Sequence, residues 1–145
     1  MARADSTFQP VGDSDARLHG VPAVLVSGFK AEEQVAFRGL MDSSGLEMVP
    51  TVYIVEVFLE RSLAELTGMP SETRAGETAE LPRAIVMSGL SEKQLHALMD
   101  GYRGSGLPRP HWGSVTPTNE SWSIKRLLIE LLKESEALRQ ARAAE

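Results

Sequence analysis

Two short runs of consecutive apolar residues, each bracketed by proline and a Ser-Gly pair, divide the chain into two similar halves. The first run is Pro22–Val26 and the second is Pro82–Met87. A run that is apolar at every position is typical of a strand buried on both faces, and proline is tolerated at the first position of a strand. The pattern therefore predicts one buried strand at the start of each half.

An amphipathic helix is predicted after each of these strands. Ser91 and Gln94 fit a capping box at the start of the second helix. Both helices run toward a Ser-Gly-Leu sequence, where we expect Gly45 and Gly106 to adopt positive φ at the helix end. The apolar positions with helical spacing are Phe37, Leu40 and Met41 in the first half, and Leu95, Leu98, Met99 and Tyr102 in the second.

A second strand and a closing helix complete each half. The strand is predicted over Thr51–Val57 in the first half and around Trp112–Val115 in the second. The closing helices are predicted to begin near Ser62 and Ser121. The last helix carries a long apolar stripe: Ile124, Leu127, Leu128, Leu131, Leu132 and Leu138.

The two halves match each other at a single ungapped offset, which indicates an internal duplication. Each half then has the order strand, helix, strand, helix. A crossover of this length implies parallel pairing within a half, so we predict an α/β fold: a tandem βαβα pseudo-repeat fused into one small domain with a mainly parallel sheet. At this offset the identical residues are Ala23 with Ala84, Ser27 with Ser88, Gly28 with Gly89, Ala36 with Ala97, Ser44-Gly45-Leu46 with Ser105-Gly106-Leu107, Ser62 with Ser123, and Leu66 with Leu127.

Two polar segments separate or precede these units. Residues 1–20 have neither a helical nor a strand period, and they are interpreted as a flexible N-terminal arm. Residues 71–80 have no large apolar side chain and are interpreted as a linker. The predicted organisation is therefore an arm (1–20), a first repeat (21–70), a linker (71–80) and a second repeat with a long C-terminal helix (81–145).

Composition removes several classes of function. The chain has 145 residues and no cysteine, which excludes disulfides, thiolate metal sites and cysteine-based catalysis. Its 3 histidines lack ligand spacing, so no metal site and no cofactor is expected. A net charge of −5 argues against a nucleic-acid binder with a basic patch. No apolar run reaches the roughly 20 residues of a membrane span, so we expect a soluble protein.

A polar cluster after the last predicted strand is the best candidate for a binding site. Thr116, Thr118, Asn119 and Trp122 align with apolar or unrelated residues of the first half. The repeat therefore does not need them in order to fold, which favours a role in recognition. The alternative interpretation is structural: Asn119 or Ser121 caps the last helix while Trp122 packs in the core.

The Ser-Gly pairs are a second candidate. Ser88 and Gly89 lie between a strand and a helix N-terminus, where backbone amides can hold a phosphate. No glycine-rich phosphate-binding motif accompanies them, so a plain strand-to-helix turn is the alternative. Neither Glu56, predicted in a strand, nor His111, at a loop-to-strand entry, pairs with a nucleophile. We therefore predict no catalytic residues and no enzyme activity.

The second half resembles domain-of-unknown-function family 3783, which occurs in bacteria and photosynthetic eukaryotes. The resemblance covers Pro82–Leu132, and its most specific part is Thr116-Pro117-Thr118-Asn119 followed by Trp122 and a leucine-rich helix. The first half (21–68) resembles a diverged copy that lacks this signature. The resemblance implies a small accessory domain located in the bacterial cytoplasm or the plastid stroma, and it implies no known activity.

Two functions are compatible with these observations. The first is a non-catalytic protein-interaction module, acting as an accessory or assembly subunit of a larger complex with protein partners. The second is a small-molecule or nucleotide-binding regulatory domain that uses the Thr116–Asn119 loop. An apolar surface patch favours the first, whereas a closed polar pocket at the end of the second strand favours the other.

Overall fold

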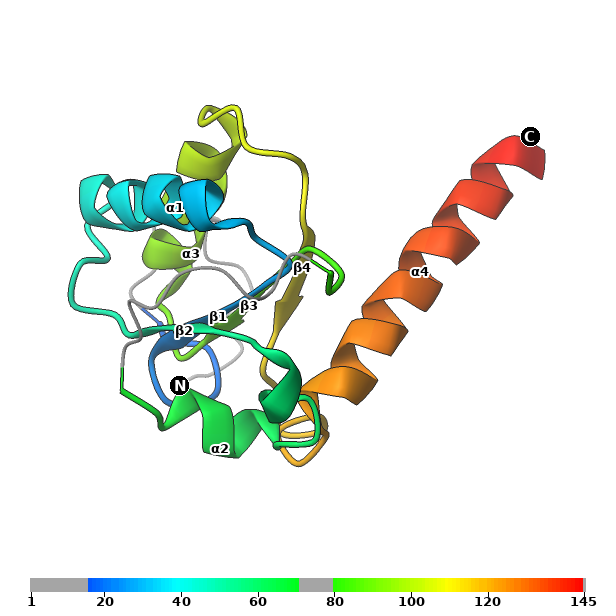
Figure 1. Cartoon of the computed structure of the whole chain (residues 1–145), viewed down its shortest axis with the longest axis horizontal. Helices are drawn as coiled ribbons and strands as arrows, with labels where there is room; N and C mark the ends of the chain where they lie inside the picture. The colour runs from blue at the N-terminus through cyan, green and yellow to red at the C-terminus, as the bar shows by residue number, and fades with distance from the viewer. Residues whose placement is uncertain (1–15, 71–79, 145) are drawn as a thin grey trace, which may run out of the picture.

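A computed structural model shows a four-stranded sheet with helices on both faces (Figure 1). It describes residues 16–70 and 80–144. Part of the predicted arm (1–15) and most of the predicted linker (71–79) thus lie outside the described residues. The elements are β1 (Ala23–Ser27), α1 (Ala31–Ser43), β2 (Thr51–Tyr53), the 3-10 helix η2 (Glu56–Phe58), α2 (Leu63–Thr67), β3 (Ala84–Ser88), α3 (Glu92–Arg103), β4 (His111–Ser114) and α4 (Ile124–Ala144).

The strand order is β2-β1-β3-β4, and two of its three pairings are parallel. Each parallel pair comes from one half of the chain, as the length of the crossovers predicted. The central pair, β1 with β3, is antiparallel and joins the two halves. The predicted α/β fold with a mainly parallel sheet is confirmed.

The two halves face each other across a pseudo-twofold axis. Leu25 pairs with Val86, its own counterpart in the repeat, and the isolated bridge between Ser62 and Ser123 joins another pair of counterparts. Hydrogen bonds beside this bridge are also reciprocal: Leu63 donates to the carbonyl of Trp122, and Ile124 donates to the carbonyl of Arg61. The duplication therefore exists in three dimensions as well as in the sequence.

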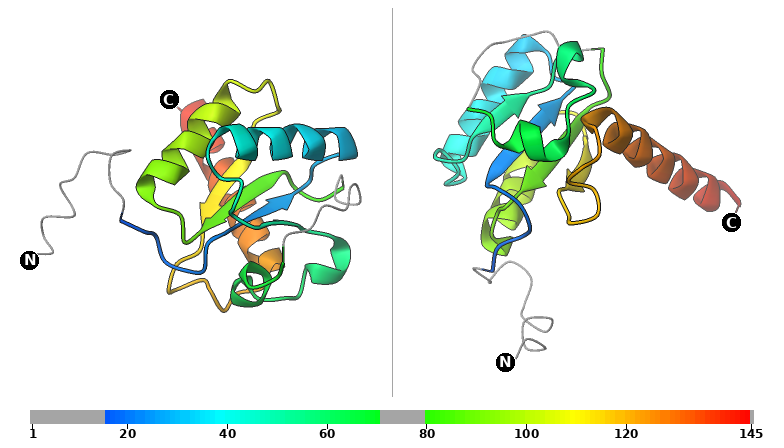
Figure 2. Two further views of the ribbon diagram at one scale, coloured as in Figure 1. Left: turned by 90° about the vertical axis from the view of Figure 1, so that its left-hand side faces the viewer. Right: turned by 90° about the horizontal axis from the view of Figure 1, so that it is seen from below.

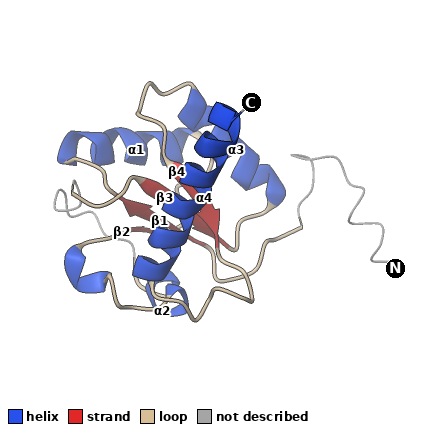
Figure 3. Cartoon of the chain, turned by 90° about the vertical axis from the view of Figure 1, so that its right-hand side faces the viewer, coloured by secondary structure: helices blue, strands red, loops and turns tan. Residues whose placement is uncertain are grey.

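A hydrophobic core lies on each face of the sheet, and helices cover both faces (Figure 3). Helices α1 and α3 cover one face, where Phe29, Phe37 and Tyr102 meet with ring centroids 5.7–6.4 Å apart. Helices α2 and α4 cover the other face, where Leu25 and Val86 are buried. The alternation of side chains along β1 and β3 supplies both cores, which explains why these strands are apolar at every position.

Local signals in the sequence fix several element boundaries. Ser91 and Gln94 form the predicted capping box of α3, with reciprocal hydrogen bonds of 2.9 and 3.1 Å. Gly45 and Gly106 have φ of 81° and 84°, as predicted for the chain reversal after each helix. Because α3 already ends at Arg103, Gly106 lies beyond the helix end, whereas Gly45 directly follows the C-cap of α1.

Two expectations about the first half were wrong. The predicted strand over Thr51–Val57 is limited to Thr51–Tyr53, and Glu56 begins the 3-10 helix η2 instead of lying in a strand. Apolar composition alone predicted a longer strand. The chain leaves the sheet after Ile54, whose amide makes the last hydrogen bond to Val26.

Residues 16–20 of the predicted arm are attached to the second half. The Leu18 amide donates to the Leu90 carbonyl at 2.8 Å, and the His19 backbone carbonyl accepts from the Gly89 amide at 3.0 Å. The Arg17 guanidinium donates to the Gly89 carbonyl. This short segment therefore belongs to the folded body, although its sequence shows no period that predicts it.

Candidate functional site

The polar segment that follows β4 forms a tightly hydrogen-bonded turn. The Asn119 side-chain oxygen accepts from the Thr116 amide at 2.8 Å, and the Thr116 hydroxyl accepts from the Asn119 amide at 3.1 Å. The Asn119 side-chain nitrogen donates to the Ser114 carbonyl at 3.0 Å. Asn119 is buried, whereas Thr118 is exposed. Most polar groups of this segment are thus engaged within the turn.

The alternative interpretation, in which Asn119 or Ser121 caps the last helix, was wrong. Helix α4 begins at Ile124, and the Ser123 hydroxyl accepts from the Arg126 amide at 3.1 Å. The Asn119 side chain makes its hydrogen bonds within its own turn instead. Trp122 packs against the core on the α2 and α4 face, where the Arg126 guanidinium carbon lies 3.9 Å from the centre of its ring.

Because β3 and β4 are parallel, their carboxyl ends lie at the same end of the sheet. Ser88 and Gly89 therefore lie at the same end as the Thr116–Asn119 turn. The N-terminal segment covers them. The Gly89 amide donates to the backbone carbonyl of His19, and the Glu92 amide in the first turn of α3 donates to the carbonyl of Ala16. The backbone amides that would hold a phosphate are therefore occupied. The imidazole Nε2 of His19 lies 2.7 Å from the carboxylate Oε1 of Glu120, and this contact connects the N-terminal segment to the polar turn.

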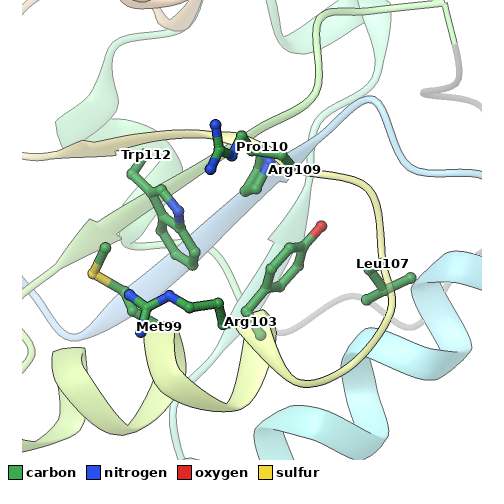
Figure 4. Close-up of a pocket in the computed structure, with 7 residues that line it drawn as sticks. Met99, Arg103, Leu107, Arg109, Pro110 and Trp112 are labelled. Carbon is green, nitrogen blue, oxygen red and sulfur yellow. The ribbon is translucent and has the colours of Figure 1, made fainter.

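The side of the sheet near α3 carries a cavity of about 440 Å³ beside β4 (Figure 4). Tyr102 and Trp112 form its aromatic part, with ring centroids 5.5 Å apart in an edge-to-face arrangement. In Figure 4, Arg103 extends from α3 and Arg109 from the loop before β4, with the Trp112 indole between them in this view. Its lining consists of Met99, Tyr102, Arg103, Leu107, Arg109, Pro110 and Trp112.

Electrostatically, this cavity combines free positive charge with neutral aromatic groups. Arg103 pairs with Asp100 at 3.0 Å, and both side chains are exposed. Within the described part of the chain, Arg109 has no carboxylate partner. Burial raises the pKa of the Tyr102 phenol, against the lowering effect of nearby Arg83, so Tyr102 stays neutral and donates to the Pro108 carbonyl. The cavity is therefore suited to an anionic group attached to an apolar stem.

A second cavity, of about 280 Å³, lies on the opposite face of β4, between this strand and α4. It shares Arg109, Pro110 and Trp112 with the first cavity. His111, a candidate from the sequence, is half-buried and lines this smaller cavity. On the α4 side its lining is Leu131, Glu134, Ser135 and Leu138. The edge strand β4 is thus flanked by a cavity on each face.

Sequence reasoning found Trp112 only as part of a strand, and it missed Tyr102, Arg103 and Arg109 as site residues. The comparison of the two halves contained the signal. Tyr102 aligns with Met41, Arg109 with Met48 and Trp112 with Thr51. These differences are as marked as those in the Thr116–Asn119 segment. They show that the repeat folds without an aromatic and arginine-rich edge.

The surface beside β4 belongs to the half of the chain that has recognisable relatives. Residues 83–138 match the model of a family described as a domain of unknown function, DUF3783. The resemblance seen in the sequence of the second half is thereby confirmed, and the match runs from the residue before β3 to Leu138 in α4. No curated protein and no solved structure matches the chain.

Two further properties of the described residues bear on the site. No group of three or more His, Asp or Glu side chains among them is placed to hold a metal ion. None of the described helices is long and apolar enough to cross a membrane.

Proposed function

We propose that this protein is a non-catalytic interaction module, an accessory or assembly subunit that binds another protein in a larger complex. The observation that carries the proposal is the outer half of α4. This half leaves the body of the protein (Figure 2). It carries Leu138, which is 61% exposed and lies seven residues, about two helical turns, after the buried Leu131. Leu138 therefore continues the apolar face of α4 beyond the sheet, and an exposed apolar face of this kind marks a surface where proteins associate.

The two halves of α4 differ in what they contact. Ile124, Leu127 and Leu128 are buried against the sheet, and burial ends at Leu131. A helix of 21 residues is roughly 31 Å long. The part of it that follows Leu131 extends beyond the sheet (Figure 1). A solitary helix gains little stability from its own hydrogen bonds in water. A partner that covers this half would supply the missing packing.

The alternative, a small-molecule or nucleotide-binding domain that uses the Thr116–Asn119 loop, has less support. The Asn119 side chain uses both its oxygen and its nitrogen inside the turn. The N-terminal segment occupies the amides of Gly89 and Glu92. Thr118 remains as an exposed hydroxyl of the turn, and one hydroxyl is a weak basis for recognising a ligand.

We also propose that the protein acts in the bacterial cytoplasm or the plastid stroma. The family resemblance of the second half supports this location. A chain without cysteine is compatible with both compartments, because it needs no disulfide for stability.

Site-specific photo-crosslinking tests the interaction proposal. Leu138 is replaced by benzoylphenylalanine, and exposed Ala36 on α1 receives the same group in a control variant. In an extract of the native source, we expect a defined protein adduct from residue 138 and none from residue 36. The variant Leu138→Glu should lose co-purification of that protein without a change in melting temperature. Equal labelling from both positions, or no adduct from residue 138, contradicts the proposal.

A further inference from the structure

The outer edge of β4 is free to accept another strand. The His111 amide donates to the carbonyl of Arg83, the residue before β3, and the Val115 amide donates to the carbonyl of Met87 in β3. The intervening Trp112 and Ser114 therefore direct their backbone groups away from the sheet. The Ser114 carbonyl already accepts a hydrogen bond from the side-chain nitrogen of Asn119. Among the described residues, no group bonds the amide or the carbonyl of Trp112. Unpaired groups in such a row are a template for strand addition.

The opposite edge of the sheet is closed. All three residues of β2 are buried, with Thr51 at 2%, Val52 at 0% and Tyr53 at 7% exposure. Every residue of β4 is half-buried. Because the two strands are counterparts in the repeat, the difference shows that an open edge is a property of the second half and not of the fold.

The two cavities match the geometry of an added strand. Successive side chains of a strand point to opposite faces of its sheet. Beside β4, one side chain of an added strand would enter the larger cavity next to α3, and its neighbours would enter the smaller cavity next to α4. Backbone hydrogen bonds then provide affinity, and the alternating cavities provide specificity.

Charge and polarity indicate which side chains fit. Arg103 and Arg109 line the larger cavity beside Trp112, which favours a carboxylate on an apolar stem. Leu131 and Leu138 line the smaller cavity, which favours an aliphatic side chain. We propose that β4 binds an extended segment of a partner protein, with a glutamate or aspartate toward α3 flanked by aliphatic residues toward α4. This inference rests on the proposed interaction function and names the partner's chemistry.

A peptide titration of the full chain tests the inference. The probe is the capped peptide Ser-Thr-Leu-Glu-Leu-Thr-Ser, followed by NMR of the ¹⁵N-labelled protein. We expect the largest shift changes at the amides of Trp112 and Ser114, slower hydrogen exchange of the Trp112 amide, and a Kd of about 1 mM or tighter, since one short strand makes few contacts. Replacing Glu by Lys in the peptide, or methylating its central backbone nitrogens, should weaken binding at least about tenfold.

Matched protein variants locate the charge that the peptide recognises. Arg109→Glu should weaken binding of the Glu peptide about tenfold or more and improve binding of the Lys peptide. Lys93→Glu, an exposed cation at the other end of α3, should leave both affinities unchanged. Unchanged amide spectra outside β4 establish that each variant is folded. Shifts centred elsewhere, no binding of the Glu peptide, or equal binding of the methylated peptide overturn the inference.

The two proposals fail in different ways. If the protein crosslinked from residue 138 is captured equally well by Arg109→Glu and the Glu peptide does not bind, the strand-addition inference is wrong and the interaction module stands. If no protein is crosslinked from residue 138, the interaction proposal fails whatever the peptide result.

Discussion

Asn119 organises the chain after β4 with both ends of one side-chain amide. It accepts a hydrogen bond from Thr116 and donates one to Ser114. Its neighbour Thr118 makes no comparable contact and is exposed. The same polar segment therefore contains one residue that holds the turn and one that is available to the surroundings, which the composition of the segment does not reveal.

We predict that Asn119→Ala lowers the free energy of unfolding by about 2 kcal/mol, because it leaves a buried amide and a carbonyl without partners. Thr118 is exposed, so the free energy of unfolding of Thr118→Val should stay within about 0.5 kcal/mol of the wild-type value. Urea unfolding of the two variants measures both effects. Similar small losses for both would show that the turn does not depend on Asn119.

At the scale of elements, an ion pair connects α1 of the first half to the start of β3 in the second. Arg83 donates to both carboxylate oxygens of Glu33, at 3.0 and 3.2 Å, and its guanidinium carbon lies 4.8 Å from the centre of the Phe29 ring. Burial by itself would raise the pKa of Glu33. The hydrogen bonds from Arg83 and from the Lys30 amide, with the positive charges of both residues, outweigh burial and lower this pKa.

The direction of this shift fixes a pH dependence. Because the pKa of Glu33 is lower in the folded state, the ionised carboxylate contributes stability above its ordinary value of 4.5, and that contribution is lost as the pH falls through the folded pKa. We predict that Glu33→Gln is less stable than the wild type at pH 7 and that the difference shrinks toward pH 3. Urea unfolding across this range measures it. A difference that is constant with pH would contradict the role of the ion pair.

At the scale of the whole molecule, the two halves form a single cooperative unit. The two halves of the sheet are joined by one continuous ladder, because β1 and β3 pair along their full length across the pseudo-twofold axis. Both hydrophobic cores take residues from both halves: Phe37 and Leu98 share one, and Leu66 and Leu128 share the other. A half alone would expose one side of each core.

We therefore predict that the facing residues Leu25 and Val86 lose hydrogen-exchange protection together. Their amides should exchange only by global unfolding, with opening free energies equal to within about 1 kcal/mol although they belong to different repeats. Native-state hydrogen exchange at increasing denaturant measures this. Exchange of one strand at a much lower free energy would show that the halves open independently.

The family match stops at the second half, and the structure gives this boundary a physical meaning. The matched residues include β3, β4 and most of α4, together with the open edge and the aromatic cavity. The first half repeats the framework but carries Met41, Met48 and Thr51 at the corresponding positions. The first half completes the sheet and the cores, and the second half carries the surface that we propose to be functional.

Much of the framework was determined by the sequence itself. The buried strands, the capping box at Ser91 and Gln94, and the positive φ of Gly45 and Gly106 follow from interactions within a few residues. Such signals act locally, so they can be read without knowing the rest of the fold. The duplication then supplied the order of the elements twice, and the crossover lengths implied the parallel pairs.

Tertiary structure alone decided how the two halves meet and where the site lies. The antiparallel pairing of β1 with β3, the attachment of residues 16–20 to Gly89, and the end of β2 at Tyr53 all depend on contacts between segments far apart in the chain. The cavities beside β4 arise in the same way, because α3, the loop at Arg109 and α4 converge on one strand. A surface assembled from distant segments has no period or spacing in the sequence, and only folding brings its residues together.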